Sequence, residues 1–528
     1  MPKAQTSTLM EGAIILTISS FLAKLLSAVY RVPFQNLVGD QGFYVYQQIY
    51  PIYGMAIILA LSSFPQFLSK VTVGQTPLAK KQTIQAYFPL IFWLSFGAWL
   101  FLFVTSKWLA IGMGDPLLAP LIRVVAFTFL LVPILALYRG SFQGEFIMVP
   151  TAISQVAEQL VRVGIILLAA LGVPLFQFTV YEVGELALTG SVFGGIIAWW
   201  VLAYYGRKIT GTSLLIRDFI GWRWPQRTLQ TRFFREAGML TIYAGLLILF
   251  QLVDSFFVVN SLKFAGMSTQ QAQVIKGVYD RGQPLVQLGL VVAGALGTSF
   301  LPLLTDYLGL KQERKFQFAA QLYLRLTVTI SLAASLGLVL LMPFLNYTLF
   351  KDFNGTRALC VFVCSIALMA TIQAFQSIDQ SRNKVLAAFK AAIGGCLVKL
   401  VTTGILTVYF QLIGASISTL FGLLTVLVIF LYFDETQVRL FWTKRRFGWR
   451  LLGVLFGMTV AVLGYDFLWY TILAGQYHRG LTLIISVLGV VLGASVFLVG
   501  AVKLKLFTIR EWLMIPFGKK MIRLGEKK

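Results

Sequence analysis

Long apolar segments dominate this chain and decide what it can fold into. About fourteen segments of roughly 20 residues or more follow one another with short connections, and each is long enough to cross a bilayer as a helix. A membrane barrel would instead need strands of about ten alternating residues, which these continuous runs do not resemble. We therefore predict an all-α polytopic membrane protein with about fourteen transmembrane helices. The predicted spans are 12–31, 43–68, 86–106, 117–138, 147–171, 182–205, 238–262, 277–305, 320–345, 357–378, 386–410, 412–433, 450–474 and 480–502.

The composition leaves no room for a water-soluble domain. Of the 528 residues, 58% are hydrophobic and only 12% are charged, which is far from the usage of soluble proteins. The first span is too long for a signal peptide and no small-residue cleavage site follows it, so we expect it to be retained. All three cysteines lie inside predicted spans, so a disulfide framework is not expected.

The net charge of +24 follows the membrane and does not indicate nucleic acid. With the N-terminus in the cytoplasm, roughly 30 of the Lys and Arg residues fall in cytoplasmic loops and about five in outer loops, as the positive-inside rule requires. The largest contributors are the loops 206–236 and 434–450 and the tail 503–528, which would also attract anionic lipid headgroups. The even number of spans returns the C-terminus to the cytoplasm.

Weak internal similarity predicts two six-helix lobes. ALSSFPQFL (60–68) resembles ALGTSFLPLL (295–304), and QLVRV (159–163) resembles CLVKL (396–400), at offsets of about 235–237 positions. Prolines at corresponding places predict interrupted helices in the second and eighth spans, although simple kinking is an equal alternative. The prolines are Pro51, Pro65, Pro284 and Pro302. The predicted division is 1–205 as N-terminal lobe, 206–236 as basic linker, 237–434 as C-terminal lobe, 435–449 as basic loop, 450–502 as an extra helix pair and 503–528 as basic tail.

Three cations at membrane depth are the first candidates for substrate binding. Lys24 and Arg31 are seven residues apart on the first span, so they share one helix face about 10 Å apart, and Arg281 lies in the eighth span beside Asp280. Adjacent residues on a helix point about 100° apart, so Asp280 and Arg281 need not neutralise each other. A cation this deep usually faces a cavity, and arginine suits phosphate oxygens. The alternative is that Lys24 and Arg31 extend to lipid headgroups.

A tyrosine face on the second span is a candidate surface for sugars. Tyr46, Tyr50 and Tyr53 follow i, i+4, i+7 spacing, and Gln47 adjoins them. Such a face could stack on sugar rings and hydrogen-bond their hydroxyls. An aromatic belt at the membrane interface is the alternative explanation.

Two further charged positions have structural alternatives. Glu158 and Arg162 are four apart in the fifth span, which predicts a structural intrahelical ion pair. Asp254 in the seventh span has no partner on its own helix. It would bind Na⁺ or a proton, or pair with a cation on another helix.

The sequence carries no catalytic set. It lacks an HExxH motif, a P-loop and a nucleophile–histidine pair, and the outer loops contain no paired carboxylates. We therefore predict that the protein is not an enzyme. An ATP-driven pump is not expected either, because it would need a nucleotide domain.

The chain resembles a known group of transporters. Three stretches look like those of SpoVB/YtgP-type polysaccharide transport proteins: YRGSFQGEFIMVPTAISQVAEQLVRV (138–163), YRVPFQNLVGDQG (30–42) and YPIYG (50–54). A fourth, YDRGQPLVQLGLVVAGALGTSFLPLL (279–304), is similar to the eighth span of MurJ-type lipid II flippases. These groups belong to the multidrug/oligosaccharidyl-lipid/polysaccharide (MOP) exporter superfamily, and the resemblance covers nearly all fourteen spans.

The resemblance implies a lipid-linked substrate and particular residues. The essential arginines of the family's first span match Lys24, which is a lysine here, and Arg31, and the arginine of its eighth span matches Arg281. The last two spans would form a groove for the polyprenyl tail. The sodium site of some members includes an aspartate that Asp254 matches, but its other ligands have no counterpart near Asp379. The family's arginine pair near the end of the second span is also missing, with only Lys70 close by.

We therefore expect a flippase that moves lipid II from the inner to the outer leaflet of a bacterial plasma membrane by alternating access. Lys24, Arg31 and Arg281 would hold the diphosphate, with Tyr46, Gln47 and Tyr50 beside it. No cofactor is expected, and coupling to Na⁺, to protons or to membrane potential alone is left open. The expected partners are the lipid-linked glycan, membrane lipids and cell-wall synthases. Alternatives are a flippase for a capsule or teichoic acid precursor, a multidrug antiporter and a membrane-embedded glycosyltransferase.

Overall fold

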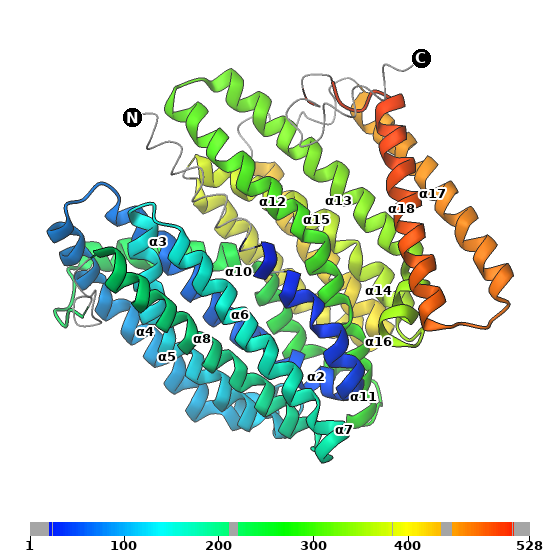
Figure 1. Ribbon diagram of the computed structural model, residues 1–528, viewed down its shortest axis with the longest axis horizontal. Coiled ribbons are helices and arrows are strands. Elements are labelled where there is room, and N and C mark those ends of the chain that lie inside the picture. Colours follow the sequence, from blue (N-terminus) through cyan, green and yellow to red (C-terminus); the bar gives the residue numbers. More distant parts are fainter. Residues whose placement is uncertain are drawn as a thin grey trace. The chain divides into compact units, whose positions relative to one another are not determined.

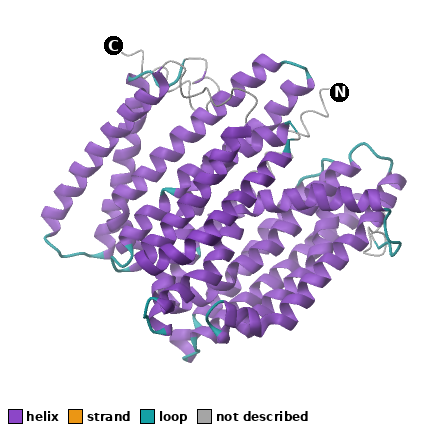
Figure 2. Ribbon diagram, turned by 180° about the vertical axis from the view of Figure 1, so that it is seen from behind, coloured by secondary structure: helices purple, strands orange, loops and turns teal. Residues whose placement is uncertain are grey.

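The computed structural model consists of helices and the loops between them (Figures 1 and 2). It describes residues 21–210, 220–433 and 446–508, apart from Lys24 and Asn383, together with Ser19 and Glu511. In these residues there is no strand, and twelve helical stretches are long and apolar enough to cross a membrane. The all-α polytopic class is therefore confirmed. The basic segments 206–236, 435–449 and 503–528 lie partly outside the described residues.

Two of the twelve stretches each contain two predicted spans. Phe21–Thr72 bends at Gly39 (φ 72°), and Leu386–Phe433 bends at Gln411 (φ 49°), where both backbones leave the helical region. A side chain at Gly414 would lie 1.9 Å from the carbonyl oxygen of Leu406, so the tight turn after Gln411 needs a glycine there. The twelve stretches thus account for the fourteen predicted spans, although the first span is described only in part.

The chain divides into two compact units. The first unit combines the described residues up to Asp280 with Cys396–Ala415, which is the middle of α16 (Val385–Phe433). The helices wholly within it are α2 (Arg31–Ile57), η1 (Ile58–Ser63), α3 (Phe64–Thr72), α4 (Pro77–Gly112), η2 (Pro116–Leu118), α5 (Ala119–Gly144), α6 (Val149–Ala170), α7 (Gly172–Phe176), α8 (Val180–Thr210), α10 (Arg227–Phe264) and α11 (Thr269–Asp280).

Within the first unit, α2 is surrounded by α5, α8, α10 and α11, while α6 packs along α8. Two glycines bring α8 close to α6. A Cβ atom at Gly190 would lie 3.0 Å from the carbonyl oxygen of Arg162, and one at Gly194 would lie 2.8 Å from that of Glu158. This small-xxx-small spacing lets the two backbones approach closely, and it fixes α6 beside the other helices of the unit.

The predicted interruption of the second span is present. The π-helical segment η1 separates α2 from α3, and Pro65 stands in the first turn of α3, where its missing N–H is tolerated. Pro51, in contrast, lies inside α2, which continues through it. In the eighth span α11 ends at Asp280 and α12 begins at Gly282, but the backbone of Arg281 between them stays helical (φ −56°, ψ −24°), so the stretch Thr269–Gly309 is continuous.

The second unit comprises Arg281–Gly395 and the described residues from Ser416 onwards. In it, α13 contacts α12, α14, α15, α17 and α18. The extra pair α17 and α18 packs together as predicted, with Gly489 and Gly493 at the contact, over a core of Phe344, Leu473 and Ile485. Its helices besides α16 are α12 (Gly282–Gly309), α13 (Glu313–Phe350), α14 (Thr356–Val363), α15 (Ser365–Ser381), α17 (Phe447–Leu473) and α18 (Arg479–Lys503).

The compact units do not follow the lobes expected from the repeat. The first unit ends at Asp280, whereas the predicted N-terminal lobe ends at residue 205 and the predicted C-terminal lobe runs from 237 to 434. The packing of the helices places α10, α11 and the middle of α16 with the N-terminal helices. The lobes describe a relation between sequences, and they remain a prediction.

Candidate functional site

Tyrosines of α2 form a row inside the first unit. The ring centroids of Tyr46 and Tyr50 lie 6.4 Å apart, and those of Tyr50 and Tyr53 lie 6.0 Å apart. The bend at Gly39 folds the preceding turn back, so that the hydroxyl of Tyr30 lies 2.9 Å from that of Tyr46. Tyr30, Tyr46 and Tyr53 are buried and Tyr50 is partly buried, so the row belongs to the protein interior and is not an interfacial belt.

Arg31 stacks on this row. Its side chain is fully buried, and its guanidinium carbon lies 4.4 Å from the centroid of the Tyr50 ring. None of its three guanidinium nitrogens has a hydrogen-bond partner among the described residues. A tyrosine face attracts a cation, but it offers much less than a carboxylate or water would. The predicted site residues Arg31, Tyr46 and Tyr50 are thus brought together around an uncompensated charge.

A second arginine, Arg162 on α6, reaches the same row. Its guanidinium carbon lies 4.8 Å from the Tyr53 ring centroid and 5.7 Å from that of Tyr30. The Nη2 atom donates to Ser27 Oγ at 3.0 Å and to Gln159 Oε1 at 2.5 Å. Its Nε and Nη1 atoms are buried without partners in the described part of the chain. Two cations with free donors therefore lie on adjacent rings of one aromatic row.

The predicted ion pair of Glu158 with Arg162 is wrong. Glu158 accepts a hydrogen bond from Arg139 of α5 at 2.8 Å, and Arg139 also donates to the carbonyl oxygen of Ala60 in η1. The i, i+4 spacing permits a pair on α6, but the packing of α5 supplies a better-placed guanidinium. Arg162 is consequently left to the tyrosines, and sequence reasoning missed it as a site residue.

Gln47 adds an acceptor near the row. It is buried, and its Oε1 atom has no hydrogen-bond partner among the described residues. Amide and phenol groups can donate to and accept from sugar hydroxyls. Lys24, the remaining predicted site residue of the first unit, lies outside the described residues.

Arg281 belongs to the second unit and is not the free cation that we predicted. Its Nη1 and Nη2 atoms contact the two oxygens of Asp352 at 2.7 and 2.8 Å, which is a bidentate ion pair, and its guanidinium carbon lies 4.9 Å from the Phe350 ring centroid. The neighbouring Asp280 pairs with Lys276 instead, at 2.5 Å. The expectation that Asp280 and Arg281 do not neutralise each other is therefore confirmed, but Asp352 takes the place of Asp280.

The environment of Asp352 stabilises its ionised form. Partial burial acts to raise the pKa of Asp352, but the Arg281 guanidinium and the Asn354 N–H together hold it below the ordinary value. Asp352 lies in the short loop between α13 and α14. An anionic ligand at Arg281 would have to displace this carboxylate.

Asp254 does not present the oxygen-lined site that a sodium ion needs. Its Oδ1 atom lies 2.7 Å from Nζ of Lys399, and its Oδ2 atom accepts from the Tyr279 hydroxyl at 3.1 Å. Of the alternatives open for Asp254, the structure has the pairing with a cation on another helix. In the described residues there is also no cluster of three or more acidic, histidine or cysteine side chains that would hold a metal ion.

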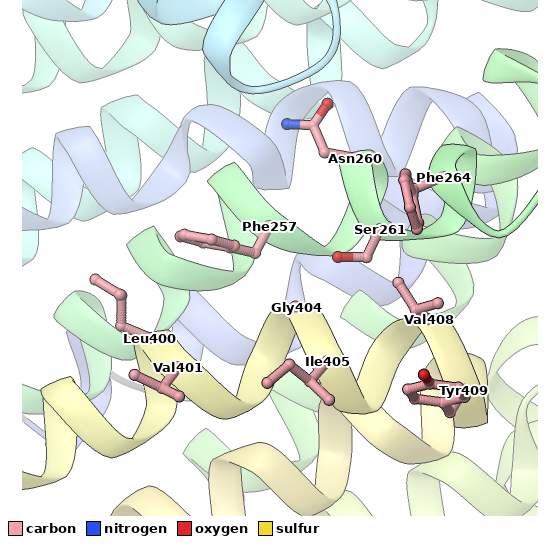
Figure 3. Close-up of a pocket in the computed structure, with 10 residues that line it drawn as sticks. All are labelled: Phe257, Asn260, Ser261, Phe264, Leu400, Val401, Gly404, Ile405, Val408 and Tyr409. Atoms are coloured by element: carbon pink, nitrogen blue, oxygen red, sulfur yellow. The ribbon is translucent and has the colours of Figure 1, made fainter.

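An apolar groove runs between α10 and the middle of α16 (Figure 3). Its volume is about 600 Å³, and its polar lining groups are Asn260, Ser261 and Tyr409. The other lining residues are Phe257, Phe264, Leu400, Val401, Gly404, Ile405 and Val408. With no charged side chain in its lining, the groove is unsuited to a diphosphate. The tyrosine row remains the candidate site.

The geometry defines a chemical preference. Guanidinium groups present planar pairs of donors that match phosphate oxygens, and aromatic rings beside them stack on sugars. A buried cation without a partner is costly, and intramembrane cations are generally retained for function. The tyrosine row therefore carries buried guanidinium donors whose chemistry suits phosphate oxygens, in a helical membrane protein.

Comparisons with known proteins agree with this class. The family model of the polysaccharide biosynthesis proteins matches residues 9–308, and the chain belongs to that family, within the MOP exporter superfamily. Two relatives come from Bacillus subtilis (strain 168). The uncharacterized membrane protein YabM is 33% identical over 98% of this chain and 97% of its own length, and the lipid II flippase MurJ is 26% identical over 80% and 82%.

Solved structures share the fold. An inward closed conformation of the lipid II flippase MurJ matches with a TM-score of 0.63 at 12% identity, covering 92% of this chain and 98% of that one. An inward-facing multidrug resistance transporter of the MATE family matches equally well, with a TM-score of 0.63 at 15% identity over 82% and 99%. Because both kinds of transporter fit alike, the substrate class has to be argued from the side chains.

Proposed function

We propose that this protein is a flippase that carries a polyprenyl-diphosphate-linked glycan, with lipid II as the first candidate, from the inner to the outer leaflet by alternating access. The observation that carries the proposal is the buried guanidinium of Arg31, which has no hydrogen-bond partner in the described residues. A diphosphate would supply the missing acceptors. The relatives named above include a lipid II flippase, which supports the same substrate class.

Arg31 and Arg162 together would bind the diphosphate. Each has at least two free guanidinium nitrogens in the described structure, and the two stack on neighbouring rings, Tyr50 and Tyr53. Tyr46 and Gln47 would then lie beside the first sugar. Lys24, seven residues before Arg31 in the sequence, would add a third charge.

The membrane potential would favour outward movement of the anionic headgroup. Moving one negative charge from an inside-negative cytoplasm to the outside is favoured by about 2.3 kcal/mol per 100 mV. A headgroup with a diphosphate carries more than one such charge. Transport in one direction therefore does not require an ion gradient.

The test is complementation of cells depleted of their lipid II flippase. We expect the wild-type protein to restore growth and to make lipid II accessible, at the outer surface of spheroplasts, to an enzyme that cleaves it. Arg31→Gln and Arg162→Gln should each reduce that accessibility at least tenfold, a loss of about 1.4 kcal/mol or more. The matched control is Arg123→Gln, because Arg123 is an arginine of the same unit whose Nε atom already donates to Ser106.

The outcome separates the proposal from its rivals. If Arg31→Gln supports normal accessibility of lipid II, the assigned role of the tyrosine row is wrong. If the wild-type protein never restores lipid II export but restores a capsule or teichoic acid precursor, the site is retained and the glycan differs, because the cations read the diphosphate and not the sugar.

A multidrug antiporter is the second candidate, favoured by the equal fold match to the MATE family. Such a transporter for cationic drugs would need a free acidic side chain in its site. In the described first unit the tyrosine row holds cations, and Glu158 is already paired with Arg139. Expression in a drug-sensitive strain should therefore leave its drug tolerance unchanged.

A further inference from the structure

The first unit contains a second set of buried charges, and here every charge is matched. Asp254 of α10 is 2% exposed and Lys399 of α16 is fully buried, with 2.7 Å between Oδ1 and Nζ. Close by, Lys276 and Asp280 pair on α11 at 2.5 Å. Tyr279 links the two pairs, because its hydroxyl donates to Asp254 while its ring centroid lies 5.2 Å from Lys276 Nζ.

The arrangement leaves no place for an added cation at Asp254. Both carboxylate oxygens accept hydrogen bonds, one from an ammonium and one from a phenol. A sodium ion there would stand beside the positive charge of Lys399 in an interior of low dielectric constant, where repulsion is weakly screened.

The position of Lys399 along α16 gives the pair a second consequence. Residues 396–415 of α16 belong to the first unit, and the bend at Gln411 ends the helical run that carries Lys399. From the next turn, Leu400, Val401 and Gly404 line the apolar groove against α10 (Figure 3). The ion pair is thus a buried polar contact between α10 and this segment, next to the apolar groove.

We propose that Lys399 is a resident counter-cation for Asp254: its ammonium occupies the position that a coupling ion would otherwise take, so that Asp254 binds no sodium and transport proceeds without a sodium gradient. The part about transport rests on the function proposed above. The part about ion binding does not, and it can be tested on a protein that flips nothing.

The first measurement uses the full-length protein in nanodiscs with ²²Na⁺ as the probe and thermal unfolding as a second readout. Wild-type protein should bind no ²²Na⁺ through Asp254, and its unfolding temperature should be the same in sodium, potassium and choline chloride. Sodium binding by the wild type that is lost in Asp254→Asn would overturn the inference, whatever the outcome of the flipping assay.

The second measurement removes the ammonium. In Lys399→Ala the freed carboxylate should gain ²²Na⁺ binding and a sodium-specific rise in unfolding temperature of about 2 °C. The double variant Asp254→Asn, Lys399→Ala removes both charges and should lose that response, which makes it the matched control. If Lys399→Ala folds but gains no sodium response, the pair serves packing alone and the inference is wrong.

The third measurement concerns transport. Wild-type proteoliposomes with an imposed membrane potential should flip lipid II at the same rate with and without sodium. Failure to flip under either condition contradicts the proposed function and leaves the ion-binding result standing. A requirement for sodium in flipping, abolished by Asp254→Asn, contradicts the role of Lys399.

Discussion

Arg31 and Arg139 are both buried in the first unit, yet their electrostatic situations are opposite. Arg139 is held by Glu158 and by the carbonyl oxygen of Ala60. Arg31 instead lies against the ring of Tyr50, and none of its guanidinium nitrogens has a carboxylate or carbonyl acceptor among the described residues. The same residue type therefore serves structure at one position and function at the other. A substitution that keeps the volume and removes the charge separates the two roles.

We expect Arg31→Met to stabilise the protein while it abolishes flipping. Removing an uncompensated buried charge relieves several kcal/mol of desolvation, against a cation–π contribution of about 2 kcal/mol or less, so a net gain of about 1–2 kcal/mol should appear as a higher unfolding temperature. Arg139→Met is the control, because it leaves the buried carboxylate of Glu158 without its ion-pair partner. This should lower the free energy of unfolding by about 3–5 kcal/mol. Equal losses of stability in both variants would mean that Arg31 is satisfied within the fold.

The pair of Arg281 and Asp352 predicts a specific dependence of stability on pH. Because the pKa of Asp352 is lowered in the folded protein, the stabilisation from its ionised form is present above the ordinary aspartate pKa of about 3.9. It is lost as the pH falls through the lowered value. The unfolding temperature of the wild type should therefore exceed that of Asp352→Asn at neutral pH, and the difference should shrink below about pH 4. A constant difference over that range would contradict the assignment.

At the scale of helices, apolar length predicted the spans well because each span must satisfy its own backbone in the membrane. Which helices pack together could not be predicted in the same way. Gly190 and Gly194 bring α8 to α6, but their spacing resembles that of other glycine pairs in the chain. The positions of α5 and α6 are needed to see that Glu158 pairs with Arg139 and not with Arg162.

A sequence signal relates Arg162, which was missed as a site residue, to Lys399. The repeat that relates QLVRV to CLVKL places Arg162 and Lys399 at equivalent positions, 237 residues apart. Each proves to be a buried cation of the first unit. Spacing within one helix suggested a local pair for Arg162, whereas the repeat relates its position to that of Lys399.

The bend in α2 supplies a prediction about an element. At Gly39 the backbone has φ 72° and ψ −177°, a region that is nearly exclusive to glycine, and a Cβ atom there would meet nothing within 4 Å. Gly39→Ala should therefore cost about 1–3 kcal/mol through backbone strain alone. It should also weaken the contact of Tyr30 with Tyr46 and lower flipping.

The matched control for that bend is Gly97→Ala. Gly97 is in the interior of α4, and its added Cβ would also meet nothing within 4 Å. There alanine should stabilise the helix by about 0.5–1 kcal/mol. Unfolding temperatures measured side by side decide the matter, and an unchanged value for Gly39→Ala would argue against a required bend.

For the whole molecule, the distribution of Lys and Arg predicts orientation. Arg314 precedes the predicted ninth span on the cytoplasmic side, and Gln270 lies in a predicted outer loop; both side chains are exposed. In a background of Cys360→Ala, Cys364→Ala and Cys396→Ala, Gln270→Cys should react with an impermeant maleimide in intact cells. Arg314→Cys should react only after permeabilisation. The reverse pattern would invert the topology.

The global division of the chain shows where sequence similarity and packing differ. A repeat records how two stretches of sequence relate, but compactness depends on which helices bury surface against one another. The middle of α16, which carries the buried Lys399, belongs to the first unit, while the flanking parts of the same helix belong to the second. The pattern of apolar residues does not predict that α16 is divided between the two units, because all parts of the helix are apolar.

The bidentate ion pair between Arg281 and Asp352 also determines which ligands can bind at Arg281. A ligand must displace a carboxylate that already binds both Nη1 and Nη2 of Arg281. A neutral sugar or a singly charged ion would interact too weakly with the guanidinium to do so. A group with two charged, coplanar oxygens and additional negative charge can displace Asp352. In the absence of substrate, Asp352 therefore prevents weaker anions from binding to Arg281.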